Sequence, residues 1–275
     1  MGQARAFVAS SFYDALMLHL AEGIDAIARE EFLFMQSQSL LPAKGIAIHG
    51  NALQAIDFQA MAVNGTALVW SPRSNLELYG QTTAIDVAAS AGVEIALAPD
   101  WAVTGSSNLL DELRFAASWN EEQLGGLFSH RQLLDMATVV PARLAGVDDE
   151  VGSIRPGLRA DLIVVKARHR GQPYHTLVDS HARNVRLVLV GGVPLYGNRS
   201  VMRRFWDDSQ LETVPLPRGS KQLATPATGG VVVAEVSSRL APVLEAAGSA
   251  LAELTEPRLV GAEDEDDDEG FDDGE

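Results

Sequence analysis

The chain has 275 residues, of which 47% are hydrophobic, so it is long enough to bury the core of one or two domains. It contains no cysteine, which excludes a disulfide framework and a metal site built on thiolates. No apolar run reaches the length of a membrane-spanning helix, and residues 1–23 lack the uninterrupted hydrophobic stretch of a secretion signal. We therefore expect a cytoplasmic protein that does not enter a membrane.

The net charge of −16 is distributed unevenly along the chain. Residues 263–275 contain ten acidic residues and no basic ones, so the rest of the chain carries only −6 of the −16. Like charges with almost nothing to bury predict a disordered tail, which either keeps the protein soluble or binds a partner. Basic and aromatic residues are not clustered anywhere, so we expect no nucleic-acid partner.

Four short apolar runs each end in a polar side chain. Such runs, separated by segments with helical spacing, are typical of buried parallel strands in an α/β fold. The runs and the residues that follow them are Leu16 to Leu18 before His19, Gly45 to Ile48 before His49, Ala67 to Trp70 before Ser71, Pro72, Arg73, Ser74 and Asn75, and Glu94 to Ala98 before Pro99 and Asp100.

Amphipathic segments between these runs predict helices over 25–41, 51–63, 82–91 and 107–119. Gly65 and Gly92 are expected to end the second and third of them, and Ser107 or Asn108 to cap the fourth. The alternation gives about four βα units, which is half of an eight-fold TIM-like barrel.

The second half of the chain is predicted to be less regular. A helix over 129–144 should be kinked or split by Pro141. Strands over 161–166, 185–190 and 193–196 should form a small β appendage, with a tight turn at Gly191 and Gly192 between the last two. Residues 214–230 have the composition of a loop, and 231–254 of an amphipathic helix. We therefore divide the chain into a partial barrel (10–145), the β appendage (146–200), a C-terminal extension (201–262) and the acidic tail (263–275).

Polar groups at the carboxyl ends of parallel strands lie where barrel enzymes build their active sites. His19, His49 and Asp100 each follow such a strand, so their side chains can converge on one metal ion. Imidazole nitrogen and carboxylate oxygen are good ligands for Zn and also suit Fe. A histidine packed in a core or a carboxylate that caps a helix remains the alternative for each residue.

The motifs that contain these residues resemble one protein family. HLAEG at 19–23, AIHGNAL at 47–53, SPRSNLELYG at 71–80 and LAPDWAVTGSSNLLDEL at 97–113 are similar to the second half of the amidohydrolase superfamily, in its deaminase and chlorohydrolase branch. TVVPARLAGVDDEVGSIRPGLRADLIVVK at 138–166 resembles the closing segment of the same proteins. The resemblance covers roughly residues 15–200, with the motifs in the family's order.

The resemblance assigns a role to each candidate residue. It implies that His19 and Asp100 bind the metal and that Asp100 also takes a proton from the attacking water. It implies that His49 polarises the substrate or the bound water and that Glu22 helps to protonate the substrate nitrogen. Trp101 either lines the substrate pocket or packs against the fold.

Other polar residues are expected to be structural. Arg73, Ser74 and Asn75 follow a predicted proline turn at Ser71 and Pro72, and the resemblance implies that they mainly shape the end of their strand. Solvated or structural roles are expected for His130, His169, His175 and His181.

The chain departs from the family in one respect. The family has a His-x-His pair that supplies two metal ligands, and no His-x-His occurs in this sequence. Only 18 residues precede His19, too few for four further βα units of ~30 residues each. We therefore expect weak metal binding, and a need for a second copy of the chain or a complementing N-terminal half.

The sequence predicts metal-dependent hydrolysis of a non-peptide C–N bond in a small molecule, such as an amide or a heterocycle that is deaminated. The alternative is a non-catalytic fragment or interaction scaffold that keeps the amidohydrolase fold, which the absent His-x-His favours. A nucleotide-binding module is not supported, because no glycine-rich phosphate loop follows any predicted strand.

Overall fold

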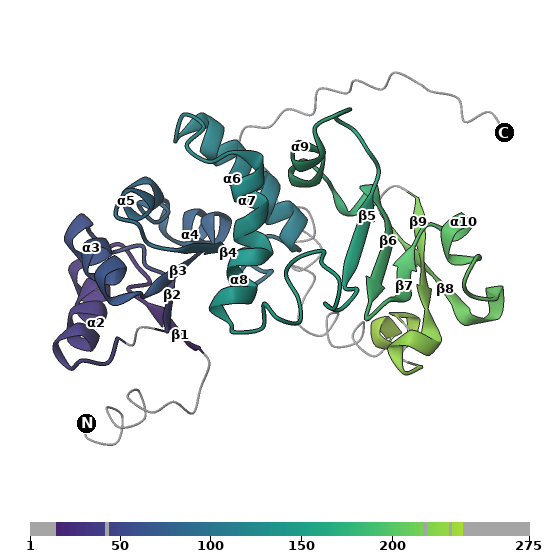
Figure 1. The fold of residues 1–275 in the computed structure, drawn as a ribbon, viewed down its shortest axis with the longest axis horizontal. Helices are drawn as coiled ribbons and strands as arrows, with labels where there is room; N and C mark the ends of the chain where they lie inside the picture. The colour runs from purple at the N-terminus through teal and green to yellow at the C-terminus, as the bar shows by residue number, and fades with distance from the viewer. Residues whose placement is uncertain (1–14, 42–43, 217–218, 231–232, 239–275) are drawn as a thin grey trace. The chain divides into compact units, whose positions relative to one another are not determined.

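The computed structural model describes residues 15–41, 44–216, 219–230 and 233–238 (Figure 1). The acidic segment 263–275 and most of the helix expected over 231–254 lie outside these ranges. Residues 233–238 of that segment are helical.

The N-terminal part contains a four-stranded parallel sheet in the order β1-β2-β3-β4 (Figure 1). The strands follow the order of the chain, as expected when each connection returns through a helix. All four predicted strands are confirmed, as β1 (Leu16–Leu20), β2 (Gly45–His49), β3 (Ala67–Trp70) and β4 (Ile95–Leu97).

Helices α2 (Ala26–Ser37), α3 (Ala55–Asn64) and α6 (Leu109–Glu122) confirm three of the predicted helices. Their ends follow ordinary capping chemistry: Asp25 accepts a hydrogen bond from the Ala28 amide, and Asn108 accepts from two amides of the first turn of α6. Gly65 ends α3 with a φ of 73°, a left-handed conformation that glycine adopts without strain.

The segment between β3 and β4 contains two helices where the sequence predicted a turn and one helix. Residues 72–79, expected to start as a proline turn, form α4 (Pro72–Tyr79). Pro72 is its first residue, a position where the missing amide hydrogen leaves no bond unmade. The helix predicted over 82–91 is shorter and forms α5 (Ile85–Ser90).

The helix predicted over 129–144 is split, but not at Pro141. It forms α7 (His130–Ala137) and α8 (Val139–Leu144), which are separated by Thr138 with φ −134° and ψ −79°. Pro141 lies in the first turn of α8, where proline is tolerated.

The C-terminal part contains a five-stranded antiparallel sheet in the order β5-β6-β7-β9-β8. The strands β5 (Leu162–Val165), β6 (Val185–Val190) and β7 (Val193–Gly197) agree with the predicted β appendage, and Gly191 and Gly192 form the expected tight turn. The sheet continues through β8 (Leu211–Pro215) and β9 (Ser220–Ala224), so the loop predicted over 214–230 was wrong. The short elements around these strands are α9 (Pro173–Val178), α10 (Arg199–Met202) and the 3-10 turns η1 (Ala182–Asn184), η2 (Asp208–Gln210) and η3 (Thr225–Thr228).

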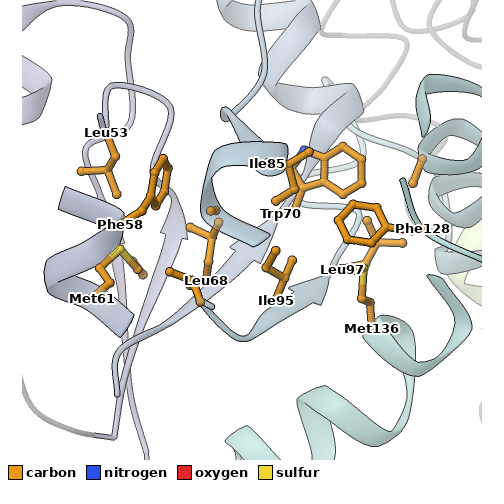
Figure 2. Close-up of a cluster of buried hydrophobic side chains, with 14 of the residues drawn as sticks. Leu53, Phe58, Met61, Leu68, Trp70, Ile85, Ile95, Leu97, Phe128 and Met136 are labelled. Atoms are coloured by element: carbon orange, nitrogen blue, oxygen red, sulfur yellow. The ribbon is translucent and has the colours of Figure 1, made fainter. Parts of the chain in front are cut away.

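One hydrophobic core packs the parallel sheet against its helices (Figure 2). The face of β3 and β4 that carries Leu68, Trp70, Ile95 and Leu97 is buried in it, together with side chains from α3, α5, α6 and α7. On the other face, Ile46 and Ala67 are also buried, whereas Met17 on the edge strand β1 is 51% exposed. The core therefore fixes the strands from the helical side and leaves their carboxyl ends to carry polar groups.

Within the described ranges, no helix is both long enough and apolar enough to cross a lipid bilayer.

Shortening Leu68 to alanine should test how much this core contributes. Leu68 is fully buried, so Leu68→Ala should lower the free energy of unfolding by about 2–5 kcal/mol, through lost transfer energy and a cavity. Val63, which is 92% exposed, provides the matched control, and Val63→Ala should change it by less than about 0.5 kcal/mol. Urea unfolding followed by circular dichroism measures both; equal effects would contradict the described packing.

His181 predicts a pH dependence of stability. Burial, and then the neighbouring cations Arg114, Arg183 and Arg168, lower the pKa of His181 to about 4, and Arg114 Nη1 lies 3.4 Å from His181 Nε2. The folded state therefore keeps this imidazole neutral, whereas the unfolded chain protonates it near pH 6.5. Stability from this group is present above pH 6.5 and is lost as the pH falls toward 4.

The matched variant is His181→Gln, which keeps a hydrogen-bond acceptor but does not titrate. Its melting temperature should fall less than that of the parent chain between pH 7.5 and 4.5, whereas the two should differ little in pH dependence above pH 7. If the melting temperatures of the two proteins fell equally between pH 7.5 and 4.5, His181 would not be protonated more readily in the unfolded chain.

Candidate active site

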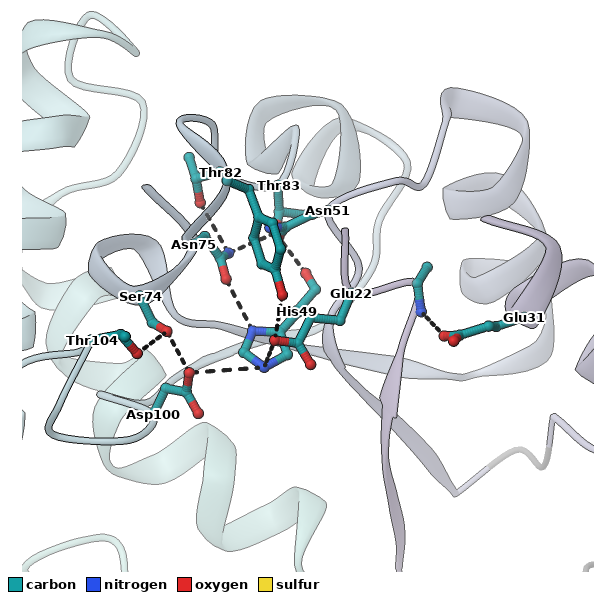
Figure 3. A network of polar contacts seen from close by, with 12 residues as sticks. Glu22, Glu31, His49, Asn51, Ser74, Asn75, Thr82, Thr83, Asp100 and Thr104 are labelled. Carbon is teal, nitrogen blue, oxygen red and sulfur yellow. Dashed lines mark hydrogen bonds and ion pairs between the residues drawn. The ribbon is translucent and has the colours of Figure 1, made fainter. Parts of the chain in front are cut away.

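The candidate site lies at the carboxyl-terminal ends of the four parallel strands (Figure 3). His19 is the last but one residue of β1, His49 is the last residue of β2, and Asp100 follows β4. The segment after β3 contributes through α4, which begins at Pro72. Parallel pairing aligns these ends, so residues far apart in the sequence become neighbours.

His19, His49 and Asp100 each offer one ligand atom, and the three atoms lie within 4.8 Å of one another. The imidazole centroids of His19 and His49 are 5.3 Å apart. His19 is exposed, His49 is 1% exposed, and the Asp100 side chain is 19% exposed. The structure thus brings together the three residues that the sequence proposed as a metal site.

The two ring nitrogens of His49 have different surroundings. Nδ1 lies 2.9 Å from Oδ1 of the fully buried Asn75. Nε2 is buried and has no hydrogen-bond partner among the described residues; the carboxylate oxygens Glu22 Oε1 and Asp100 Oδ2 lie 3.6 and 4.0 Å from it. An orphaned polar atom in a native fold calls for an explanation, and a bound ligand is one.

Glu22 reaches the site from the turn after β1, and Tyr79 orients it. The Tyr79 hydroxyl donates a 2.9 Å hydrogen bond to Glu22 Oε1. Burial and then this bond to the carboxylate raise the pKa of Tyr79 to about 12, so the phenol remains a donor at every working pH. Tyr79 ends α4, so the helix that the sequence did not predict fixes the position of this carboxylate.

Asp100 is held by the hydroxyl group of Ser74. Ser74 Oγ donates a short hydrogen bond to Asp100 Oδ2 and lies 3.2 Å from Thr104 Oγ1. The loop after Asp100 turns tightly enough that a side chain at Gly105 would place Cβ 1.9 Å from the Pro99 carbonyl oxygen. Ser74 was expected to shape the strand end, and it does so through direct contact with a candidate ligand.

Both His49 and Asp100 have left-handed backbone conformations, with φ values of 74° and 60°. A residue other than glycine in this region costs about 1–3 kcal/mol, and such residues cluster at functional sites. Both side chains belong to the cluster at the shared edge of the sheet. No sequence signal identified these two conformations.

Behind the cluster, α4 is tied to α6 by a buried polar group. The Arg73 amide donates to Glu112 Oε1 at 3.2 Å, and Arg73 Nε donates to Ser106 Oγ at 2.7 Å. Burial raises the pKa of Glu112, although Arg73 opposes that shift, and the Arg73 guanidinium lies over the Phe115 ring at 4.5 Å. Sequence analysis missed Glu112, which reads as an ordinary acidic residue near a helix start.

Other candidate residues lie outside the cluster. Trp101 is 68% exposed and is not one of the three clustered residues. His130, His169 and His175 stack on one another, with ring centroids 4.3 and 3.7 Å apart. Among the described residues, none of these three histidines belongs to the cluster of His19, His49 and Asp100.

Comparisons with known proteins identify the family of the chain. Residues 14–195 match the model of the amidohydrolase family. A 5-methylthioadenosine/S-adenosylhomocysteine deaminase of Desulfitobacterium hafniense is 32% identical over 202 residues, which are 67% of this chain and 46% of the deaminase. An S-triazine hydrolase of Gordonia rubripertincta is 25% identical over 230 residues, 78% of this chain and 46% of the hydrolase. The chain thus spans about half the length of the curated relatives it matches.

Solved structures share the fold. An adenosine deaminase from Xanthomonas campestris with bound zinc superposes with a TM-score of 0.59 at 24% identity, over 66% of this chain and 45% of the other. Atrazine chlorohydrolase from Arthrobacter aurescens TC1, complexed with zinc, gives 0.60 at 22% identity, over 70% and 47%. Together with the match over residues 14–195, these likenesses lead to one conclusion: the chain belongs to the amidohydrolase family.

Proposed function

We propose that this chain carries one side of the active site of a metal-dependent hydrolase, which cleaves a non-peptide C–N bond in a small molecule. The observation that carries the proposal is the convergence of His19, His49 and Asp100 within 4.8 Å, beside the carboxylate of Glu22. In this interpretation β1 to β4 correspond to the second half of the family's barrel.

The donor set fits a divalent metal ion. Two imidazoles and a carboxylate are ligands that Zn prefers, and the three donor atoms lie within 4.8 Å of one another. The buried, unpartnered Nε2 of His49 supports an additional group at this point. His19 and Asp100 would hold the ion, with His49 Nε2 facing it. Zinc is favoured over iron by the two zinc-bound neighbours.

When bound, a divalent cation supplies Lewis acidity that lowers the pKa of water enough to provide hydroxide near neutral pH. The chain's own groups move the protons. Asp100, held by Ser74, accepts the proton of the attacking water, and Glu22, held by Tyr79, donates a proton to the leaving nitrogen. His49 polarises the attacking water as an acceptor when its ring is neutral, or the substrate as a donor when both ring nitrogens carry protons. Ammonia or an amine then leaves with the proton from Glu22. The hydroxyl proton of the intermediate moves to the ring nitrogen as the new C–O bond becomes a carbonyl, and the proton held by Asp100 returns to Glu22.

The relatives suggest the substrate class. They are named for deaminating an adenosine derivative and for hydrolysing an s-triazine, both nitrogen heterocycles with a leaving group on an sp² carbon. We propose a heterocycle of this kind. Because the sequence contains no His-x-His, we also propose that the metal is bound weakly by this chain alone. A second copy, or a complementing N-terminal half, would supply further ligands.

Metal uptake tests the ligand set. The full chain, stripped with a chelator, should bind Zn²⁺ in titration calorimetry. His19→Ala and Asp100→Asn should each weaken binding by at least about tenfold, since each removes one of three donors. His130→Ala, outside the cluster, should leave the affinity unchanged. If His130→Ala weakened binding and the site variants did not, the proposed ligands would be wrong.

Ammonia release tests the reaction. The full chain with Zn²⁺ should be assayed on aminopurine nucleosides and amino-s-triazines, both alone and mixed with the N-terminal half of the D. hafniense deaminase. We expect turnover in the mixture, and Glu22→Gln should lower it by about 10²–10⁴-fold, the usual contribution of a general acid. Glu30→Gln, on α2, is the matched control. Tight zinc binding without turnover in any mixture would favour the non-catalytic scaffold.

A further inference from the structure

The hydrogen bonds around His49 determine which of its ring nitrogens carries the proton. The argument begins at the His49 carbonyl oxygen, which can only accept. Thr83 Oγ1 lies 2.6 Å from it and therefore donates its single hydroxyl proton there. The bond is made to the backbone of His49, the residue whose φ is 74°. Thr83 itself is 2% exposed, so water does not compete for the hydroxyl.

With its proton committed, Thr83 can only accept from other neighbours. The Asn75 amide lies 3.3 Å away, so the Asn75 atom that faces Thr83 must be the donor Nδ2. Nδ2 also reaches Thr82 Oγ1 at 3.2 Å, an oxygen that accepts a 2.8 Å bond from the Trp70 indole. The orientation of the Asn75 amide is thus set by its partners.

Asn51 is consistent with this assignment. Asn51 Oδ1 lies 3.0 Å from Thr83 Oγ1 and would compete for the same proton, while Asn51 Nδ2 has no partner in this orientation. Turning the Asn51 amide by 180° makes Nδ2 the donor to Thr83 and removes the competition for its proton, while Oδ1 takes the place where Nδ2 had no partner. The Thr83 hydroxyl then donates once and accepts twice, which uses its full capacity.

The remaining Asn75 atom, Oδ1, faces His49 Nδ1 at 2.9 Å. An amide oxygen only accepts, so Nδ1 must carry a hydrogen. We propose that Asn75 is a positioning residue that keeps the proton on His49 Nδ1, so that Nε2 alone exchanges a proton or offers a lone pair to the site. Asn75 and Thr83 are 0% and 2% exposed, which protects this chain of bonds from water.

This inference rests on the proposed function only for its consequence. In the neutral ring, Nε2 has a lone pair and acts toward a metal ion or a water molecule as an acceptor, not as a donor. In the charged ring both nitrogens carry protons, and the Asn75 contact is unchanged. A hydrogen-bonded partner of this kind typically contributes ten- to a hundredfold to metal affinity. Asn75 therefore does more than shape the end of its strand.

Nitrogen NMR of the full chain, without metal, measures the tautomer directly. The protein would be labelled with ¹⁵N in its imidazoles and observed at pH 8, where an ordinary histidine of pKa ≈ 6.5 is neutral. The His49 signals are assigned by their loss in His49→Gln. We expect Nδ1 protonated and Nε2 unprotonated in the parent chain. A parent spectrum with the proton on Nε2 would overturn the inference.

Variants test the role of Asn75. Asn75→Asp keeps an acceptor facing Nδ1 and should keep the tautomer, whereas Asn75→Leu should give a mixture of tautomers and weaken Zn²⁺ binding about tenfold. Thr83→Val should also give a mixture of the two tautomers. The control is Thr138→Val, which removes a hydroxyl that donates to the Leu134 carbonyl and should leave the His49 tautomer unchanged. An unchanged tautomer in a folded Asn75→Leu would overturn the inference. Absence of hydrolysis would count against the proposed function but would leave the tautomer result intact.

Discussion

The hydrogen bond between His49 Nδ1 and Asn75 Oδ1 is the contact on which the candidate site depends most. It joins the end of β2 to α4, and so connects one strand end to the helix that follows the next strand. The same helix presents Ser74 to Asp100 and Tyr79 to Glu22. One short helix therefore orients three of the groups to which we assign chemistry.

Strain and burial act together at this edge of the sheet. His49 and Asp100 have positive φ values, and the surrounding bonds hold them there. The buried pair of Arg73 and Glu112 anchors α4 to α6 from behind, which limits the movement of α4 relative to the strand ends. A site assembled from rigid elements in this way is placed before any ligand arrives, which is the arrangement that catalysis by oriented groups requires.

The sequence predicted the strands and the residues at their ends, because both depend on local patterns. Continuous apolar runs marked β1 to β4, and the polar residue after each run indicated the shared edge. Helix α4 was missed because Ser71 and Pro72 read as a turn, although proline also suits the first position of a helix. Strands β8 and β9 were missed because the composition of 214–230, rich in proline, glycine and threonine, is typical of a loop.

The contacts of Asn75 and Glu112 could not be predicted, since they join residues 26 and 39 positions apart. Local propensity contains no information about such pairs, and the positive φ of His49 depends on them too. Sequence analysis found the residues that point into the site but not those that hold them in place. The residues that hold the others in place are the ones that fix the geometry of the site.

The central claim is that one metal ion binds between His19, His49 and Asp100. Anomalous diffraction at the zinc absorption edge, from crystals of the full chain grown with Zn²⁺, tests it most directly. The account predicts a peak within about 2.0–2.2 Å of a His19 nitrogen and an Asp100 oxygen. A peak beside His130, His169 or His175 with none at the strand ends would contradict it.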